Sequence, residues 1–166
     1  ELLNSQVERC NEILKRLTLN PVEEDEFIDK DINIRDYLHE IISSFKEISK
    51  KEFIFNFDQD SNPKKITKSI ELVYGLRNFI GNANKFAKNT IFINLKSDSE
   101  ITEITVEDDG DGYPRDIISK IGEPYLKSNY SKDKSKEGLG LGLFIGKTLL
   151  EKNFASVNCR NSKTRN

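Results

Sequence analysis

The chain has 166 residues, 33% of which are charged, and its formal net charge is only -2. This length suits one domain with an appendage, and the near-neutral charge gives no reason to expect a nucleic-acid partner, because domains that bind nucleic acid usually carry a basic surplus. No apolar run approaches the ~18–20 residues of a membrane span and no signal peptide opens the sequence, so a membrane is expected only through segments outside it.

Cysteine, histidine and methionine are scarce. The two cysteines are too few for a disulfide framework, and with a single histidine they do not support a structural zinc site. Because methionine is absent altogether, we expect the sequence to be part of a longer protein that continues upstream.

The first predicted element is a helix over residues 1–18, with apolar residues at alternating spacings of four and three that are typical of a coiled-coil or bundle seam. These residues are Leu3, Val7, Cys10, Leu14 and Leu17. A helix this short needs a partner, either its own domain or the other helix of a dimerising hairpin. Asn20-Pro21 ends the helix, and the acidic run 23–26 indicates a linker over 19–30.

From about residue 31 to 166 the pattern is mixed α and β, which we interpret as one domain. The expected helices and strands are 34–48 (helix), 53–57 (strand), 69–88 (helix), 90–96 and 101–108 (strands) and 141–152 (helix). The polar turn Asp98-Ser99-Glu100 predicts a hairpin between the strands 90–96 and 101–108. This order indicates an α+β fold, a two-layer α/β sandwich with helices on one face of a mixed sheet.

The helix over 69–88 carries an apolar side, which we expect to pack on the sheet, and a polar side. The apolar residues are Leu76, Phe79, Ile80 and Ala83. Asn78, Asn82 and Lys85 fall within roughly 60° of one another on the other side. Such residues can form an ordinary solvated face, but asparagine is a poor helix former. A carboxamide oxygen can ligate Mg²⁺ without adding charge, which suggests a metal site with Lys85 close to a phosphate.

A second motif, Asp108-Asp109-Gly110-Asp111-Gly112, follows a predicted strand. Because side chains alternate along a strand, Asp108 is expected to point inward as the strand ends. A buried carboxylate needs a hydrogen-bond donor, and an adenine amino group is suitable. The alternatives are an ordinary acidic turn and a calcium loop, although the later glutamate of such a loop is missing.

A third motif, Gly138-Leu139-Gly140-Leu141-Gly142-Leu143, opens the last predicted helix. Free backbone amides at a helix N-terminus can hold phosphate. The motif is not a P-loop, because no Gly-Lys-Ser/Thr follows, and its glycine spacing does not fit a dinucleotide fingerprint.

Together, and in this order, the three motifs resemble the ATPase domain (the Bergerat fold) shared by histidine kinases, gyrase, Hsp90 and MutL, the GHKL superfamily. Asn78–Phe86 resembles its asparagine box, Asp108–Gly112 its first glycine box and Gly138–Gly142 its second. The lysine-rich segment 127–137 stands where these proteins have a mobile lid.

Within the superfamily the chain most resembles sensor histidine kinases of two-component systems, and among these the RegB/PrrB-type redox sensors. The resemblance rests on Ile121-Gly122-Glu123-Pro124-Tyr125, on GLGLGLFIGKTLLEK, and on SQVERCNEILKRL at 5–17, which is similar to the second helix of the dimerisation hairpin. Cys10 matches the redox-sensing cysteine of that group, although its place on the apolar seam also suits a small hydrophobic residue.

This resemblance implies ATP and Mg²⁺ as cofactors and a role for each matching residue. Asn82 would be the main Mg²⁺ ligand, with Asn78 assisting. The remaining ATP-binding residues would be Lys85 at a phosphate, Phe86 against adenine, Asp108 at its amino group, Gly110 and Gly112, Tyr125 anchoring the lid, and Gly138, Leu139, Gly140, Leu141 and Gly142 around the phosphates. Tyr74 stands where relatives often carry an acid.

The resemblance also implies transfer of the γ-phosphoryl group to a histidine upstream of Glu1 and relay to a response-regulator aspartate. His39 lacks the expected downstream proline and is interpreted as an exposed helix residue, so the fragment alone should not autophosphorylate. The parent would be a homodimeric inner-membrane sensor, of which this is a cytoplasmic portion that ends before the last strand of the sheet.

Two other functions remain open. An anti-sigma-type serine kinase shares this pocket, but should lack the helix over 1–18. A non-catalytic scaffold that has lost its nucleotide shares the fold, but should not retain Asn82, Asp108 and the glycines.

Overall fold

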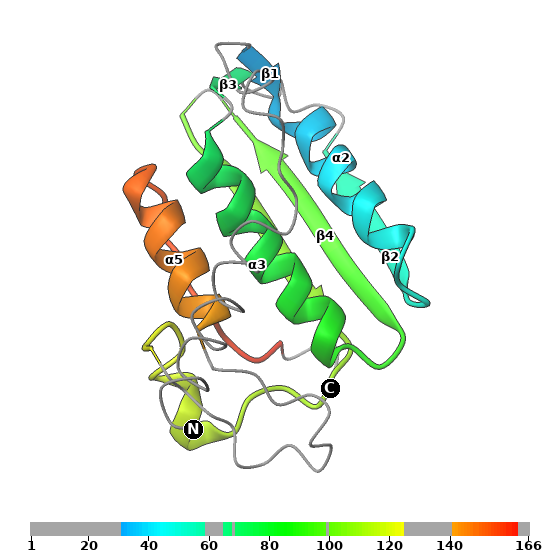
Figure 1. Cartoon of the computed structure of the whole chain (residues 1–166), viewed down its shortest axis with the longest axis vertical. Coiled ribbons are helices and arrows are strands. Elements are labelled where there is room, and N and C mark those ends of the chain that lie inside the picture. The colour runs from blue at the N-terminus through cyan, green and yellow to red at the C-terminus, as the bar shows by residue number, and fades with distance from the viewer. Residues whose placement is uncertain (1–30, 59–64, 68, 99, 125–140, 163–166) are drawn as a thin grey trace, which may run out of the picture.

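The computed structural model describes residues 31–58, 65–67, 69–98, 100–124 and 141–162 (Figure 1). The predicted helix over 1–18, the linker over 19–30 and the proposed lid over 127–137 lie outside these residues. In the part of the chain that the structure describes, no helix is both long and apolar enough to cross a membrane.

A mixed three-stranded sheet forms one layer. Its strands are β2 (Glu52–Phe57), β4 (Thr90–Ser97) and β5 (Thr102–Asp108). β4 is central, pairing in parallel with β2 and antiparallel with β5. The predicted hairpin is confirmed, because Oδ1 of Asp98 accepts hydrogen bonds from the backbone N–H groups of Glu100 and Ile101 at 2.8 Å each.

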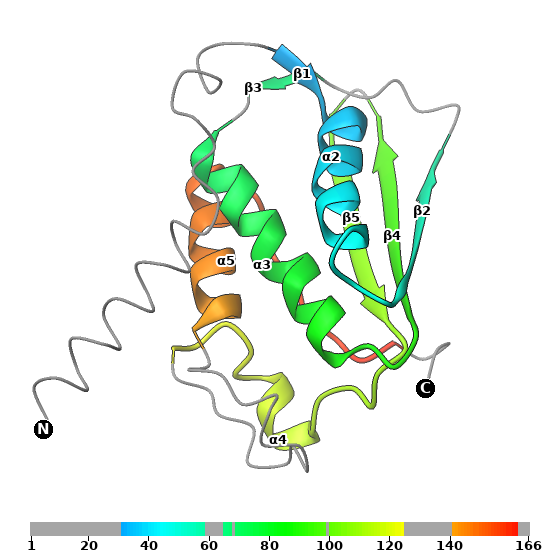
Figure 2. The same cartoon turned by 45° about the vertical axis from the view of Figure 1, so that its right-hand side comes forward.

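Helices form the second layer. They are α2 (Ile34–Lys46), α3 (Ile70–Phe86) and α5 (Gly142–Lys152). Figure 2 shows α2 and α3 on one face of the sheet, with α5 packed against α3 on the side away from α2. Two helices begin at polar caps, since Asn33 accepts from the N–H of Arg35 at 2.9 Å and Ser69 from that of Leu72 at 3.1 Å. The predicted two-layer α/β sandwich is confirmed.

The core lies between the two layers. The central strand contributes Ile91, Ile93 and Leu95, which are at most 1% exposed, and the helices contribute Leu38 and Ile80, which are fully buried. Each such side chain stabilises the fold by about 1.5–3 kcal/mol through burial. The apolar residues that alternate along β4 and those that recur at helical spacing along α2 and α3 thus face each other in one apolar layer, as the sequence pattern predicts.

Three short elements were not expected from the sequence. β1 (Asp31–Asn33) and β3 (Lys65–Thr67) form a small antiparallel pair beyond the ends of α2 and α3, and α4 (Arg115–Ile118) follows β5. No strand is present in residues 155–162.

The last helix ends in an unusual way. The N–H of Phe154 donates to the carbonyl of Glu151 at 3.0 Å, and that of Ala155 donates to the carbonyl of Leu150 at 3.1 Å. This is a Schellman arrangement, in which the residue after the cap is usually glycine. Here it is Phe154, with φ of 61° and a side chain that is 99% exposed. After Phe154 the chain turns back and runs toward the C-terminal end of α3 (Figure 1).

Candidate functional site

The polar side of α3 holds two asparagine amides whose nitrogens are occupied. Nδ2 of Asn78 donates to the carbonyl oxygen of Tyr74 at 2.8 Å, and Nδ2 of Asn82 donates to the hydroxyl oxygen of Tyr113 at 2.8 Å. Among the described residues, neither Oδ1 accepts a hydrogen bond. Two carboxamide oxygens, one helical turn apart, are therefore available to a hard cation, which is the ligand type that Mg²⁺ prefers.

The start of α5 lies against the first of these asparagines. A Cβ atom on Gly142 would lie 3.5 Å from Oδ1 of Asn78, and one on Gly146 would lie only 2.9 Å from Cβ of Asn78. Glycine at position 146 thus allows the two helices to approach closely. Leu141, the residue before the helix, makes no side-chain capping bond. The first N–H groups of a helix such as α5 are of the kind that bind anions.

Asp108 ends β5 beside the C-terminal end of α3. Ile104 and Val106 on the same strand pack against the core, as the alternation predicts, and Asp108 is half-buried. Its Oδ1 accepts a hydrogen bond from the N–H of Gly110 at 2.8 Å. Burial raises the pKa of Asp108, while the bond from Gly110 and the charge of Lys51 oppose that rise. In the described part of the chain, Oδ2 of Asp108 accepts no hydrogen bond.

Gly110 is needed where it stands. A Cβ atom there would lie 2.6 Å from the carbonyl oxygen of Phe86 and 2.5 Å from Oδ1 of Asp108. The loop after β5 therefore passes directly over the last residue of α3. Gly112 has a positive φ of 73°, which glycine adopts without strain.

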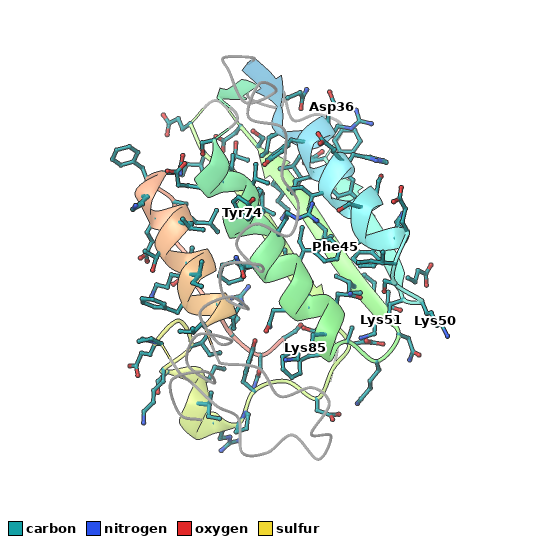
Figure 3. All side chains as sticks on the ribbon, viewed as in Figure 1. Asp36, Phe45, Lys50, Lys51, Tyr74 and Lys85 are labelled. Carbon is teal, nitrogen blue, oxygen red and sulfur yellow. The ribbon has the colours of Figure 1, made fainter. Side chains whose placement is uncertain are left out.

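Lys85 and Phe86 are the last two residues of α3, and Figure 3 shows Lys85 at this end of the helix. Nζ of Lys85 lies 5.3 Å from the centre of the Phe86 ring. Both side chains are half-buried. The structure thus brings the end of the asparagine box next to the first glycine box through the contact between Phe86 and Gly110.

Asp109 connects the loop after β5 to the loop between α3 and β4. Its Oδ1 accepts hydrogen bonds from the N–H groups of Lys88 at 2.7 Å and Asn89 at 3.0 Å. Desolvation acts to raise the pKa of Asp109, but these backbone donors outweigh it and hold the pKa below its usual value. Lys88 also forms an ion pair with Asp111 at 2.5 Å. Asp109 and Asp111 therefore hold the loop, and only Asp108 faces inward.

Lys51, the residue directly before β2, was not identified from the sequence. Its Nζ donates to the carbonyl oxygens of Asn84 and Ala87, the latter at 2.6 Å, at the end of α3. A cation at this end of a helix complements its dipole. Its charge also opposes the rise in the pKa of Asp108 that burial causes. Lys50 and Lys51 are neighbours in Figure 3, and only Lys51 turns toward α3.

Tyr113 and Asn161 were also missed. Oδ1 of Asn161 accepts from the backbone N–H of Tyr113 and Nδ2 of Asn161 donates to its carbonyl oxygen, both at 2.8 Å. Burial raises the pKa of Tyr113 to about 12, and the charges of Cys159 and Asp108 act in the same direction against the bond from Asn82. The phenol is therefore neutral at physiological pH. The one feature of the sequence that could have indicated Tyr113 is its position directly after Gly112.

Several predicted residues are not part of the described site. Tyr125, Gly138, Leu139, Gly140 and Cys10 lie outside the described residues. His39 is exposed on α2, and its ring contacts that of Phe55 edge to face at 5.9 Å. Phe55 belongs to β2, the strand at the opposite edge of the sheet from β5.

The sequence and the fold both have known relatives. Residues 67–165 match the family described as histidine kinase-, DNA gyrase B- and HSP90-like ATPases. The chain is 31% identical over 170 residues to the sensor histidine kinase RegB of Cereibacter sphaeroides, an alignment that covers 98% of this chain and 36% of RegB. The chain thus spans well under two thirds of this relative's length.

Solved structures share the fold, among them two sensor histidine kinases. The mycobacterial sensor histidine kinase MprB matches with a TM-score of 0.59 and 19% identity, over 73% of this chain and 79% of that chain. Full-length ShkA in complex with AMPPNP matches with a TM-score of 0.58 and 23% identity, over 72% of this chain and 25% of that chain. The predicted resemblance to RegB-type sensor histidine kinases is confirmed, and the chain belongs to the family of histidine kinase-, DNA gyrase B- and HSP90-like ATPases.

Proposed function

We propose that this domain binds Mg²⁺·ATP between the polar side of α3, the loop after β5 and the start of α5, and serves as the catalytic part of a sensor histidine kinase. The observation that carries the proposal is the half-buried Asp108, whose second carboxylate oxygen has no donor in the described part of the chain. A half-buried acceptor of this kind is suited to the amino group of adenine. The complex of ShkA with AMPPNP supports an adenine nucleotide as the ligand.

The other residues fit the rest of the nucleotide. Phe86 lies next to Gly110 and offers an aromatic ring to the adenine. The amide oxygens of Asn78 and Asn82 would hold Mg²⁺, which when bound neutralises the charge of the phosphates. Lys85 and the N-terminus of α5, where Leu141 makes no side-chain capping bond, would bind phosphate oxygens. Gly138, Gly140 and Tyr125 are proposed to complete this side.

The proposed reaction moves the γ-phosphoryl group of ATP to an imidazole nitrogen, with ADP as the leaving group. In such transfers the protein mainly positions the reactants and neutralises charge. His39 is not the proposed acceptor, because its ring packs on Phe55 over the strand farthest from β5. The acceptor would be a histidine of the longer protein, from which the phosphoryl group passes to a response-regulator aspartate.

The wider setting is proposed from the relatives alone. RegB is a sensor histidine kinase of which this chain covers 36%. We infer a homodimeric membrane sensor in which this domain is the cytoplasmic catalytic part, with Cys10 as a redox-sensing residue.

A calorimetric titration with ATP tests the proposal. The wild-type chain should bind ATP more tightly with Mg²⁺ than with EDTA. The variant Asp108→Asn should bind at least roughly 10-fold more weakly, because a hydrogen bond to a charged group contributes about 1.5–3 kcal/mol. Glu103→Gln is the matched control, since it makes the same chemical change at an exposed position of β5.

The outcomes separate the alternatives. Equal ATP affinity in a folded Asp108→Asn variant would refute the adenine contact. Absence of binding by a folded wild-type chain would favour the scaffold that has lost its nucleotide. Incorporation of labelled phosphate at His39 would contradict the proposed acceptor.

A further inference from the structure

The chain's C-terminal segment is connected to the proposed metal site by hydrogen bonds that run from Asn161 through Tyr113 to Asn82. Asn161 holds the backbone of Tyr113 on both sides, through its N–H and its carbonyl, at 2.8 Å each. The hydroxyl of Tyr113 in turn accepts from Nδ2 of Asn82 at 2.8 Å. The connection spans 48 residues from Asn161 to Tyr113 and 31 from Tyr113 to Asn82.

An amide side chain has two different ends, and only one of them can bind a cation. When Nδ2 of Asn82 is bound to Tyr113, Oδ1 points to the other side of the amide group. Without that bond the amide could rotate by half a turn, because the torsion that sets its plane is broad and roughly two-fold. In this structure the hydroxyl of Tyr113 accepts from Nδ2, and this bond holds Asn82 with Oδ1 turned away from the tyrosine.

The backbone around Tyr113 is held as firmly as its hydroxyl. An exchange of N–H and C=O bonds with one residue is the pattern of a hydrogen-bonded pair between antiparallel strands, and here the amide of Asn161 supplies it. Gly112 makes this approach possible, because a Cβ atom there would lie 2.9 Å from Oδ1 of Asn161. The position of the Tyr113 backbone thus depends on Asn161, a residue of the C-terminal segment.

We propose that Tyr113, held in place by Asn161, is a positioning residue that turns the carboxamide oxygen of Asn82 toward the bound cation. The inference rests on the proposed function, and it adds a residue pair that links metal-supported ATP binding to the C-terminal segment. Tyr113 acts through Asn82 and is not a metal ligand itself.

The test compares ATP affinity in excess Mg²⁺ and in EDTA for the whole chain, and uses the ratio of the two as the measured quantity. In Tyr113→Phe the ring remains and the hydroxyl is lost. The affinity in EDTA should stay within about 2-fold of wild type, whereas the Mg²⁺-dependent ratio should fall by roughly 10-fold, as is usual when a residue that orients a metal ligand is removed. Tyr37→Phe removes a hydroxyl from the core of α2 and should leave the ratio unchanged.

A purely structural role of Tyr113 predicts a different result. If Tyr113→Phe weakens ATP binding equally with and without Mg²⁺, the hydroxyl shapes the pocket in general and the proposal is overturned. An unchanged ratio also overturns it. If Asp108→Asn abolishes ATP binding while Tyr113→Phe keeps the full ratio, the proposed function stands and this inference alone fails. If the wild-type chain does not bind ATP, both fail.

A second variant decides the matter should Tyr113→Phe not fold. Asn161→Ala leaves the hydroxyl in place and removes only the two bonds to the backbone of Tyr113. The same selective loss of the Mg²⁺ effect is expected, at about 3-fold, which corresponds to the roughly 0.5–1.5 kcal/mol of a neutral hydrogen bond. A folded Asn161→Ala variant with the wild-type ratio would overturn the proposal.

Discussion

The two sides of α3 are made from one helix but are packed in different ways. On the side that faces the sheet, Leu76, Ile80 and Ala83 are at most 5% exposed. On the other side, Asn78 and Asn82 are half-buried, and each uses its amide nitrogen while its oxygen accepts no bond from the described residues. Residues that break local rules without a packing reason are expected at functional sites. The difference indicates which side of the helix serves stability and which serves a ligand.

The largest effect on folding is expected on the sheet-facing side. Ile80→Ala should lower the free energy of unfolding by about 2–5 kcal/mol, because it leaves a cavity at a fully buried position. Ile48→Ala, at a position that is 79% exposed, should change it by less than about 0.5 kcal/mol. Urea denaturation measures both, and equal losses would show that the sheet-facing side of α3 does not form the core.

Gly110, in the loop after β5, and Gly81, within α3, should respond in opposite ways to substitution by alanine. Gly110→Ala should destabilise the chain by about 1–3 kcal/mol, because the new methyl group meets the fixed carbonyl of Phe86 at 2.6 Å. Gly81→Ala places a methyl group 3.6 Å from the Phe45 ring, an ordinary contact, and should stabilise α3 by about 0.4–1 kcal/mol. Thermal melts of the two variants should move apart, and a stabilised Gly110→Ala would refute the close passage of the loop over α3.

A smaller effect is expected where α3 ends. Lys51→Met should cost about 1–2 kcal/mol, because the carbonyls of Asn84 and Ala87 lose a charged donor. It should also raise the pKa of Asp108 further, since the charge of Lys51 opposes that rise. Lys50→Met is the control, and a change in urea midpoint as large as that of Lys51→Met would show that the loss of charge alone matters.

The smallest effects concern two adjacent carboxylates with opposite pKa shifts. The pKa of Asp108 is raised on folding, so its contribution favours the folded state at low pH and is lost as pH rises through the folded pKa. The pKa of Asp109 is lowered, so its contribution is present above the ordinary carboxyl pKa and is lost as pH falls through the folded pKa.

These signs predict opposite behaviour of two amide variants. Asp109→Asn should be less stable than wild type at pH 7, by at most about 1 kcal/mol, and the difference should disappear as pH falls through the folded pKa of Asp109. Asp108→Asn should remove the decline in stability that Asp108 causes as pH rises from the ordinary carboxyl pKa through its raised folded pKa. Thermal melts across this range check both, and the same sign in the two variants would contradict the assignment of Asp108 as the inward-facing acid.

The regular elements could be predicted because their periods are long enough to recognise. α3 was expected at 69–88 and is Ile70–Phe86, and β5 was expected at 101–108 and is Thr102–Asp108. By contrast, β1 and β3 have three residues each and α4 has four. Such segments contain too few residues to show a period of 2 or 3.6, so their pairing depends on tertiary structure.

The candidate site was predictable only where its residues lie within one motif. Asn78, Asn82 and Asp108 stand at recognisable spacings within the resemblance to the ATPase family. Lys51 and Asn161 act on residues 33 to 48 positions away, and neither belongs to a motif. No periodicity in one sequence reports such a pairing. The metal-binding and nucleotide-binding roles themselves stay predictions.

Phe154 gives the molecule a point at which a protease can enter. Its side chain is 99% exposed and its backbone has left the helical conformation, so chymotrypsin can reach the following peptide bond once the hydrogen bond from the N–H of Ala155 to Leu150 opens. Cleavage there separates Asn161 from α5 in the chain, although two hydrogen bonds still hold it to Tyr113. A nicked molecule would then retain its C-terminal peptide only for as long as those bonds and the packing of Val157 persist. The lifetime of the nicked complex would therefore measure how firmly Asn161 and Val157 together hold this peptide on the domain.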